Sequence, residues 1–338
     1  MPTIGDVARR AGVSRSTVSY ALSGKRTISR ETRDRIDRVI AELGFTPNAG
    51  ARALATSQTM VLGLLLQFHA DEFAPAMLQY VLPVSEAARR LGYDILMVTD
   101  ANGAGAIRRI GDSEMVDGIV LLDVTHDDPR LDSLRSVRQP AVLIGLPGDT
   151  RDLDAIDLDF SAAARQIVEH LAANGHREVV LISPPHHVVE RGGSYVWRFR
   201  DPAVERGREL GIRVHAYYGE SRPPAVQTSV HRILDAHPSA TALVVHNDAT
   251  IAALPAVLRD RGIVVPRDLS VVSLYSRDFA EEFSLPYTAV ESAADTLGRR
   301  AVDLLVHRIL DPAKAGPHAV QFVEPVLRDR GSVRTLQG

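Results

Sequence analysis

A short polar segment near the N-terminus carries side chains that could bind a polyanion. The segment AGVSRSTVSYALSGK, residues 11–25, places Arg15 and Ser16 at the start of a predicted helix and Tyr20 about one turn later. Arginine and serine at such a position can donate hydrogen bonds to base edges in a DNA groove. Hydroxyl groups of the same segment suit phosphate oxygens: Ser14, Thr17 and Ser19. These residue types favour contact with a nucleic acid.

A second group of polar and aromatic side chains lies close behind predicted strands. Its members are Phe73, Trp197, Arg198, Asn247, Asp248, Tyr275 and Glu291. Ligands of parallel sheets bind just beyond the carboxyl ends of the strands. Fixed donors and acceptors beside an aromatic face suit a polyhydroxylated ligand. Asn247 and Asp248 are also preferred helix N-caps, so we expect both roles in part.

Three predicted helices must position the first segment. Each follows a capping hydroxyl: 4–11 after Thr3, 15–22 after Ser14 and 30–43 after Ser29. Ala8, Gly12 and Val18 have helix-turn-helix spacing, with a small residue at the helix crossing, a turn, and an apolar plug. The second helix of that motif lies in the major groove. The alternative is an ordinary three-helix bundle whose serines only cap helices.

The stretch AGARALATS, residues 49–57, has a helical pattern but is marginal in isolation. It is shorter than the roughly 12–15 residues that an isolated helix needs, and Gly50 weakens it further. Leu54 is its one large apolar side chain and lies near Arg52, as in proteins that press an apolar wedge into a minor-groove step. We predict a segment that folds on docking to DNA; a plain linker is the alternative.

Beyond residue 59, short apolar strands alternate with helical stretches in two similar blocks. The strands are VLGLLLQF, YDILMVTD, DGIVLLDV and AVLIGL in the first block and REVVLIS, IRVHAYYG, ALVVH and LSVVSLY in the second. Continuous apolar strands between helices indicate parallel sheets covered on both faces. The predicted fold class is α/β: an all-α helix-turn-helix head and two doubly wound parallel subdomains that face each other across a cleft.

Charge is distributed unevenly along the 338 residues. Residues 1–58 hold ten Lys or Arg against five acidic residues, a formal charge of +5, whereas the remainder carries −8. A basic head on an acidic body indicates that the polyanion contact is confined to the head.

Several functions are disfavoured by what the chain lacks. There is no Cys for disulfides or thiolate metal sites, and no apolar run reaches the roughly 20 residues that span a bilayer. The N-terminus has no apolar core of a secretory signal, so we expect a cytoplasmic protein without membrane contact. His126 and the pair His186 and His187 lack further ligands at metal-site spacing. With no nucleophile–base motif either, we expect no catalysis, no cofactor and no metal.

The first 55 residues resemble the lactose-repressor (LacI/GalR) family almost without gaps. The matching pieces are DVA, AGVS, TVS, the S-x-x-T-R at Ser29, the AELGF-x-PN around Phe45 and the closing A-x-x-LA, and the similarity continues to the C-terminus. The resemblance implies a transcriptional repressor that binds a near-palindromic double-stranded operator as a homodimer. It also implies control by a small, sugar-like effector bound between lobes of the type I periplasmic-binding-protein fold. No leucine heptad follows the final strand, so we expect no tetramer.

Carried over by position, the family's base-reading residues fall on Arg15, Ser16 and Tyr20, and its minor-groove wedge falls on Leu54. Tyr20 stands where the family often has Arg, and Tyr cannot make the bidentate contact with guanine. The base preference there stays open, and Arg15 could supply such a contact instead. The predicted DNA-binding set is Thr3, Ser14, Arg15, Ser16, Thr17, Ser19, Tyr20, Ser23, Thr27, Asn48, Arg52, Leu54 and Ala55.

The resemblance also marks the cleft. The family's ligand-gripping Arg matches Arg198, and its Asn-Asp pair matches Asn247 and Asp248. After LSVVS the family usually has an Asp, where this chain has Tyr275 followed by Ser276. Two explanations are open: the ligand is not a simple hexose, or Asp278 substitutes through a shifted loop.

The expected organisation has three parts: a helix-turn-helix head (1–46), a hinge helix or linker (47–58) and a two-lobed effector-binding and dimerisation domain (59–338). Within the last part the resemblance implies one lobe over 60–157 and 290–316, and the other over 158–288 with the final strand. The alternative is a binding module of periplasmic type, or an enzyme, whose head only oligomerises. The sequence is compatible with an effector that releases DNA and with one that promotes docking.

Overall fold

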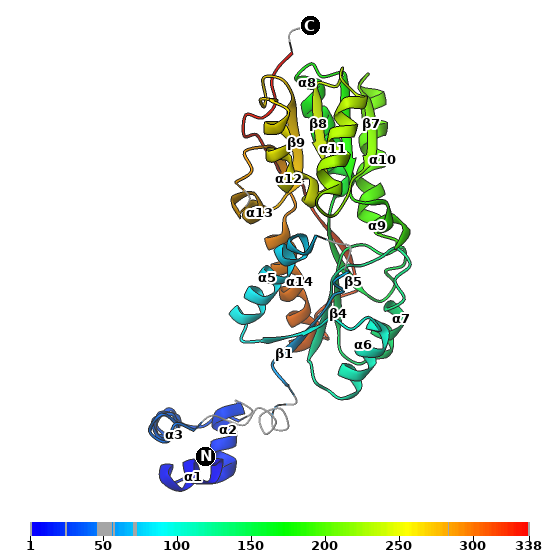
Figure 1. The fold of residues 1–338 in the computed structure, drawn as a ribbon. Helices are drawn as coiled ribbons and strands as arrows, with labels where there is room; N and C mark the ends of the chain where they lie inside the picture. Colours follow the sequence, from blue (N-terminus) through cyan, green and yellow to red (C-terminus); the bar gives the residue numbers. More distant parts are fainter. Residues whose placement is uncertain are drawn as a thin grey trace.

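A small helical head precedes two stacked α/β lobes in the computed structural model (Figure 1). The structure describes residues 2–23, 26–45, 56, 58–69, 73–282 and 284–336. Most of the predicted hinge, 47–58, therefore lies outside the described residues, and its folding on DNA stays a prediction.

The head consists of α1 (Ile4–Ala11), α2 (Arg15–Ser23) and α3 (Arg30–Leu43). Each helix begins at a side-chain cap, as predicted. Thr3 and Asp6 form a reciprocal capping box on α1. The backbone N–H of Thr17 donates to Ser14 Oγ at 3.0 Å, and that of Thr32 donates to Ser29 Oγ at 3.2 Å. These caps fix the ends of three helices that are short on their own.

The turn between α1 and α2 is made by Gly12, whose backbone is left-handed with φ 64°. A side chain at that φ is strained, so glycine suits the sharp change of direction. Ala8 and Val18 are both buried, in agreement with the helix-turn-helix spacing. The apolar core of the head consists of Val7, Ala8, Ala11, Val18, Ile36, Val39 and Phe45.

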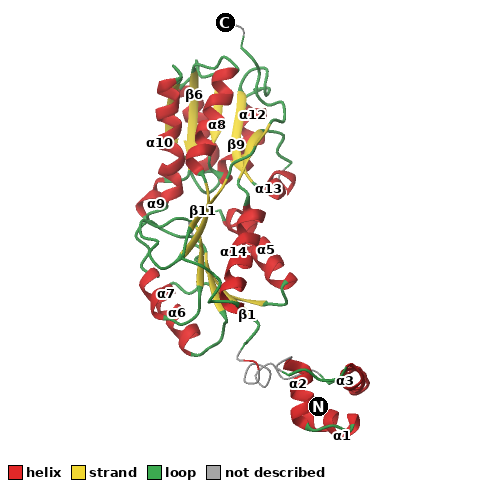
Figure 2. Ribbon diagram, turned by 180° about the vertical axis from the view of Figure 1, so that it is seen from behind, coloured by secondary structure: helices red, strands yellow, loops and turns green. Residues whose placement is uncertain are grey.

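The first lobe is built on a six-stranded parallel sheet in the order β11-β5-β4-β3-β1-β2. Its strands are β1 (Val61–Leu65), β2 (Asp94–Val98), β3 (Gly118–Leu121), β4 (Ala141–Ile144), β5 (Asp154–Leu158) and β11 (Val320–Val323). One face packs against α5 (Ala74–Arg90) and α14 (Ala294–Leu310), and the other packs against α6 (Gly103–Asp112) and α7 (Leu131–Ser136). Figure 2 shows the sheet with α14 and α5 on one side and α6 and α7 on the other.

The second lobe has a six-stranded sheet in the order β12-β10-β9-β8-β6-β7. Its strands are β6 (Glu178–Ser183), β7 (Arg213–Tyr218), β8 (Ala242–Val245), β9 (Ser270–Tyr275), β10 (Thr288–Glu291) and β12 (Leu327–Arg328). Only β12 pairs antiparallel among the strands described. Its helices are α8 (Phe160–Ala173), α9 (His186–Glu190), α10 (Ser194–Glu209), α11 (Ala225–Ala236), α12 (Asp248–Asp260) and α13 (Arg277–Glu282).

Both faces of the second sheet are covered. α8 and α10 pack on one face, whereas α11, α12 and α13 pack on the other. The chain crosses between the lobes after β5, after β10 and after β11. The two doubly wound subdomains agree with the prediction from the sequence.

The lobe boundaries differ from expectation at two places. The whole of β10 belongs to the second sheet, and 320–323 returns to the first sheet as β11. Strand β5 was not predicted, because its acidic residues break the apolar run. Burial would raise the pKa of Asp154, but hydrogen bonds from Arg308, Ala319 and His318 lower it. The Arg308 guanidinium donates to both carboxylate oxygens, at 2.5 and 2.9 Å, so a charged residue can lie in this strand.

Candidate functional site

The start of α2 presents its polar side chains to solvent. Arg15 and Ser16 are exposed, and Tyr20 is half-buried, with the Arg26 guanidinium 5.9 Å from its ring centroid. Arg15 also extends over α1, since a Cβ atom placed on Gly5 would lie 2.8 Å from its Nη2 atom. The guanidinium therefore reaches along the surface of the head rather than into its core.

Hydroxyl groups form a small network at the same helix end. Ser14 Oγ lies 2.7 Å from Ser16 Oγ and 2.8 Å from Thr17 Oγ1. Thr3 and Thr27 are exposed, and Ser19 is half-buried. Four members of the predicted DNA-binding set lie outside the described residues: Asn48, Arg52, Leu54 and Ala55. Ser23 ends α2, but its side chain is not described.

A cavity of about 240 Å³ lies between the two lobes. Its aromatic and polar lining comes from both sides. The first lobe supplies Phe73, Gln79, Tyr80, Asp123 and Asp157, and the second supplies Phe160, Tyr195, His246, Asn247, Asp248 and Tyr275, among others. An apolar pocket with a few convergent polar groups is the usual form of a small-molecule site.

Asp248 is the carboxylate whose charge the cavity disfavours most clearly. It is the first residue of α12, and burial raises its pKa to about 6. Gln79 Nε2, on α5 of the first lobe, lies 3.5 Å from Asp248 Oδ1. At neutral pH this group is a desolvated acceptor that faces the opposite lobe.

Asp157 is held by an arginine behind the cavity. Burial raises its pKa, and the Arg198 guanidinium opposes that shift. Arg198 Nη1 donates to Asp157 Oδ2 at 2.5 Å, and Nη2 donates to the Leu158 carbonyl at 3.3 Å. The same guanidinium lies 5.4 Å from the ring centroid of Phe160. Arg198 thus joins α10 of the second lobe to the end of β5 in the first.

A third carboxylate lies at the end of β3. Asp123 has a left-handed backbone, with φ 52°, and backbone strain of this kind is concentrated at functional sites. His69 Nε2 lies 3.3 Å from Asp123 Oδ2. Asp123, Asp157 and Asp248 therefore offer acceptors at three points of the cavity wall.

The buried polar atoms of the lining that have no hydrogen-bond partner within the described structure include Gln79 Oε1 and His246 Nδ1. Burial lowers the pKa of His246 to about 3, so its imidazole is neutral. The ring is fixed among Phe160, Phe199 and Tyr195, at centroid distances of 5.7, 4.4 and 5.7 Å. Such atoms are costly unless a ligand or water satisfies them.

Asn247 caps α12. Its Oδ1 accepts from the backbone N–H of Thr250 at 2.9 Å, and its Nδ2 donates to the carbonyls of Ser183 and Glu220 at 3.4 and 3.3 Å. The predicted capping role is confirmed. Because both ends of the amide are engaged, Asn247 shapes the cavity wall and its direct contact with an effector stays a prediction.

Tyr275 belongs to the lining of the cavity. Its hydroxyl donates to the Tyr287 carbonyl at 2.5 Å, and the residue is 1% exposed. Phe73 also lines the cavity and packs edge-on against Phe279. Asp278 is an exposed residue of α13 and is not part of the lining. The shifted-loop explanation for the missing Asp therefore finds no support in this conformation.

The other three predicted effector contacts lie outside the lining. Trp197 packs edge-on against His126, with 5.9 Å between ring centroids, and Arg198 lies behind Asp157. Glu291 instead forms ion pairs with three arginines. Its Oε1 lies 3.9 Å from Arg277, 3.6 Å from Arg328 and 3.8 Å from Arg330.

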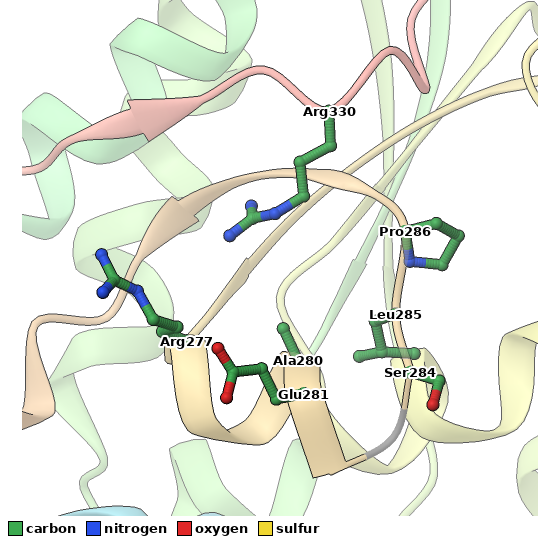
Figure 3. Close-up of a pocket in the computed structure, with 7 residues that line it drawn as sticks. All are labelled: Arg277, Ala280, Glu281, Ser284, Leu285, Pro286 and Arg330. Carbon is green, nitrogen blue, oxygen red and sulfur yellow. The ribbon is translucent and has the colours of Figure 1, made fainter.

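Arg277 and Arg330 also line a separate pocket of about 310 Å³ beside α13. Figure 3 shows Arg330 opposite Arg277 and Glu281 across it. Direct effector contact by Trp197, Arg198 and Glu291 would require a conformation other than this one.

Sequence reasoning missed several members of the lining. Asp123 lies inside the predicted strand DGIVLLDV, whereas β3 ends at Leu121, so the strand-end rule missed it because the strand was predicted too long. Asp157 was missed with β5. Gln79 and Tyr80 belong to the middle of α5, and the face that a helix turns to a cleft is set by tertiary packing.

Within the part of the chain that is described, no helix has the length and apolarity needed to cross a membrane. Residues 3–48 match the model of bacterial regulatory proteins of the lacI family, and residues 168–333 match that of a periplasmic binding protein-like domain.

Relatives match over the whole chain. The HTH-type transcriptional regulator CelR of Thermobifida fusca is 31% identical over 336 residues, which cover 98% of each chain. A solved complex of the transcriptional regulator CelR with cellobiose is 28% identical, with a TM-score of 0.66 over 98% of this chain and 100% of that one. The lac repressor dimer bound to operator and the anti-inducer ONPF is 23% identical, with a TM-score of 0.79 over 98% and 99%. The chain belongs to the lacI family of bacterial regulatory proteins.

Proposed function

We propose that this protein is a homodimeric transcriptional repressor whose affinity for a near-palindromic operator is set by a small polyhydroxylated effector. The observation that carries the proposal is one chain that joins a helix-turn-helix head to an interlobe cavity lined from both sides. In this account the protein acts in the cytoplasm and is a regulator rather than an enzyme.

Base edges are read by the start of α2. Arg15, Ser16 and Tyr20 enter the major groove, and Leu54 presses into a central minor-groove step with Arg52 beside it. Phosphate oxygens are bound by hydroxyl groups around the helix ends: Thr3, Ser14, Thr17, Ser19, Ser23 and Thr27. The net charge of +5 on residues 1–58 supports this assignment, because phosphate contacts supply much of the affinity for DNA.

The effector occupies the cavity between the lobes. Asp123, Asp157 and Asp248 accept hydrogen bonds from its hydroxyl groups, and Phe73 and Phe160 cover its apolar face. Ionised carboxylates make the stronger, charge-assisted bonds. The cellobiose complex of a relative supports a carbohydrate as the effector. Because Tyr275 stands where the family usually has an Asp, the carboxylate acceptors for this effector come from other walls of the cavity.

Coupling follows from the two-sided lining. An effector that bridges Gln79 of the first lobe and Asp248 of the second favours one angle between the lobes. The first lobe leads directly into the hinge, so this angle sets the separation of the two heads in a dimer. The effector shifts the population of dimers that can dock on both half-sites. A coupling of about 1–3 kcal/mol suffices for a 5–150-fold change in affinity.

The partner copy packs on α5 in this account. Leu78 and Leu82 are 46% and 65% exposed and lie one helical turn apart on the same face. Met97, on the edge strand β2, is also exposed. An apolar row of this kind on a surface helix marks an interaction site, and a second copy gives the two-fold symmetry that a near-palindrome requires.

The direct test is fluorescence anisotropy with promoter fragments, including the region upstream of the protein's own coding sequence. We expect specific binding that weakens steeply with salt and changes when a sugar raises the melting temperature. A panel of mono- and disaccharides, sugar alcohols and nucleosides identifies that ligand. If the full-length protein binds a ligand from the panel but no promoter fragment, the alternative of a binding module without a DNA role is correct.

A further inference from the structure

Three metal-ligating side chains meet at the edge of the second lobe. Glu178 is the first residue of β6, His215 lies in β7, and His237 directly follows α11. One ligand atom from each residue lies within 4.8 Å of the other two, and all three residues are partly buried. No other such group occurs among the residues that the structure describes.

The contacts within the group show that its donor atoms converge. His215 Nε2 lies 3.1 Å from Glu178 Oε1. The rings of His215 and His237 are 4.1 Å apart between centroids, with an angle of 32° between their planes. The Tyr217 hydroxyl lies 2.6 Å from His237 Nε2. Two imidazoles and a carboxylate thus share one small volume that remains open to water.

We propose that Glu178, His215 and His237 form a binding site for a divalent transition metal, with Zn²⁺ the best fit. Zinc prefers nitrogen ligands and carboxylates, and three protein ligands leave its fourth tetrahedral position for water. Imidazole ligands also disfavour Mg²⁺ and Ca²⁺, which prefer oxygen.

The required adjustment is small. Zinc bonds of about 2.0–2.1 Å place tetrahedral ligand atoms roughly 3.3 Å apart. His215 Nε2 and Glu178 Oε1 already have about this separation, and any pair near the 4.8 Å bound would approach by about 1.5 Å. His237 lies in the loop after α11, with φ −129° and ψ 62°. The direction of its side chain is therefore not set by helical geometry. The metal replaces the hydrogen bond between His215 and Glu178 with two coordinate bonds.

The backbone supports this grouping. Glu178 is in register with Arg213 on the neighbouring parallel strand, and His215 lies two residues further along. Residues two apart on a strand face the same side of the sheet. Glu178 and His215 therefore share a face, and the end of α11 supplies the third ligand above it. Arg213 is a cation beside Glu178 that competes with a metal for its carboxylate. A divalent metal ion has twice the charge of the guanidinium and therefore attracts the carboxylate more strongly.

This site is separate from the effector cavity. β6 begins at Glu178 and ends at Ser183, whose carbonyl accepts from Asn247 in the cavity wall. Five residues at about 3.3 Å each place the two sites roughly 16 Å apart. In Figure 1, β7 and α11 lie on the upper part of the second lobe. The metal ties the edge strand β7 and the end of α11 to β6, so it stabilises this lobe.

The sequence did not predict a metal site, because these three ligands do not have the short spacings of known metal-binding motifs. The histidines considered there were His126, His186 and His187. The three ligands found here come from separate segments, which only the fold brings together.

The test uses the full-length chain without a polyhistidine tag, stripped of metal with a chelator and then titrated with zinc by isothermal calorimetry. We expect one Zn²⁺ per chain and a higher melting temperature with zinc, since ligand that binds only the folded state stabilises it. Cobalt in place of zinc should give the visible absorption of a tetrahedral site.

Two variants remove one ligand each: Glu178→Gln and His237→Gln. Loss of groups that only orient a ligand costs roughly 10–100-fold in metal affinity, so each variant should bind zinc at least about tenfold more weakly. His231→Gln is the matched control, because His231 lies on α11 and contacts Arg261 instead. Circular dichroism checks that all variants fold. Absence of zinc binding by the parent protein, or equal binding by all four proteins, would overturn the proposal.

Discussion

Ionised Asp248 destabilises the folded protein because it is buried, although its charge favours hydrogen bonds to the proposed effector. Its folded pKa of about 6 lies above the ordinary value of 3.8, so the folded state holds its proton to a higher pH than the unfolded state. Between about pH 4 and pH 6 this group makes the protein less stable as pH rises, and above pH 6 the loss is complete. A shift of about two units corresponds to at most about 3 kcal/mol.

We therefore predict that Asp248→Asn raises the melting temperature of the free protein at pH 7 and removes its stabilisation by the effector. The gain over the parent should be small at pH 4, should grow up to about pH 6 and should then remain constant. Asp278→Asn, at an exposed residue of α13, is the control. Thermal unfolding across this pH range measures both effects, and a pH-independent difference would contradict the assignment.

Arg15 is the residue from which we expect base discrimination. Arg15→Ala should cost about 1–3 kcal/mol on the best operator and relax the preference at one or two base pairs. Arg15→Lys keeps the charge but not the bidentate geometry, so it should relax the preference while retaining more affinity. Thr27→Ala, which removes a proposed phosphate contact, should weaken all sequences alike. Binding to operators with single base-pair changes measures this, and an unchanged site preference in Arg15→Ala would assign the reading to another residue.

At the scale of elements, the lobes are joined by Arg198. Its guanidinium contacts Asp157 and the Leu158 carbonyl at the end of β5 and lies 5.8 Å from the Phe322 ring centroid on β11. All three contacts belong to the first sheet, whereas Arg198 is on α10 of the second lobe. These contacts hold α10 against the first sheet in this conformation. In the proposed mechanism, the effector changes the angle between the lobes that they bridge.

We predict that Arg198→Ala destabilises the protein by about 3–5 kcal/mol, because it leaves the buried Asp157 without its partner. Arg198→Lys should cost less in stability yet still weaken the effector's control of DNA binding. Arg206→Lys on the same helix is the control, since its partners Glu169 and Glu209 are on the surface and such pairs contribute about 0–1 kcal/mol. Denaturant unfolding and operator binding with and without effector measure the two effects. An equal loss of unfolding free energy at Arg198 and at Arg206 would contradict the proposed role of Arg198 in joining the lobes.

Local chemistry explains which elements were predictable. The head was predicted closely, because Thr3, Ser14 and Ser29 cap its helices and Gly12 makes its turn, all within a few residues in sequence. Most buried strands were found from their apolar runs. β5 was not, because Asp154 is compensated by Arg308, more than 150 residues away.

The site divides in the same way. Residues at or just beyond strand ends could be placed at the cavity from sequence, such as Tyr275, the last residue of β9, and Asp248, which follows β8. Gln79 on α5 could not, because its orientation depends on how the lobes close. The helix-capping role of Asn247 was predicted correctly. The position of Glu291 near three arginines was not, because only the folded chain brings these residues together.

At the scale of the whole molecule, the account requires a dimer. Leu82 is the most exposed of the large apolar side chains on α5, and Leu82→Glu would bury two like charges near the two-fold axis of the proposed interface. We predict a monomer by light scattering, with effector binding retained and operator affinity lost. Val264→Glu, at an exposed apolar residue of the second lobe, should remain dimeric. A dimeric Leu82→Glu variant with normal operator binding would place the interface elsewhere.

In the proposed mechanism, the segment 47–58 connects the dimer to the DNA. Leu54→Ala should weaken operator binding while effector affinity stays near that of the parent, because the proposed wedge touches only DNA. Gel-shift and thermal-shift measurements on the same preparation compare the two. Equal operator binding by mutant and parent would refute the wedge.

Control of the helix-turn-helix head by the interlobe cavity is tested by the operator affinity of the full-length dimer with and without saturating effector. Fluorescence anisotropy should show a 5–150-fold change for the parent. Asp248→Asn should bind the operator but show no response to the effector. An effector that stabilises the parent protein through the cavity yet leaves its operator affinity unchanged would contradict the account.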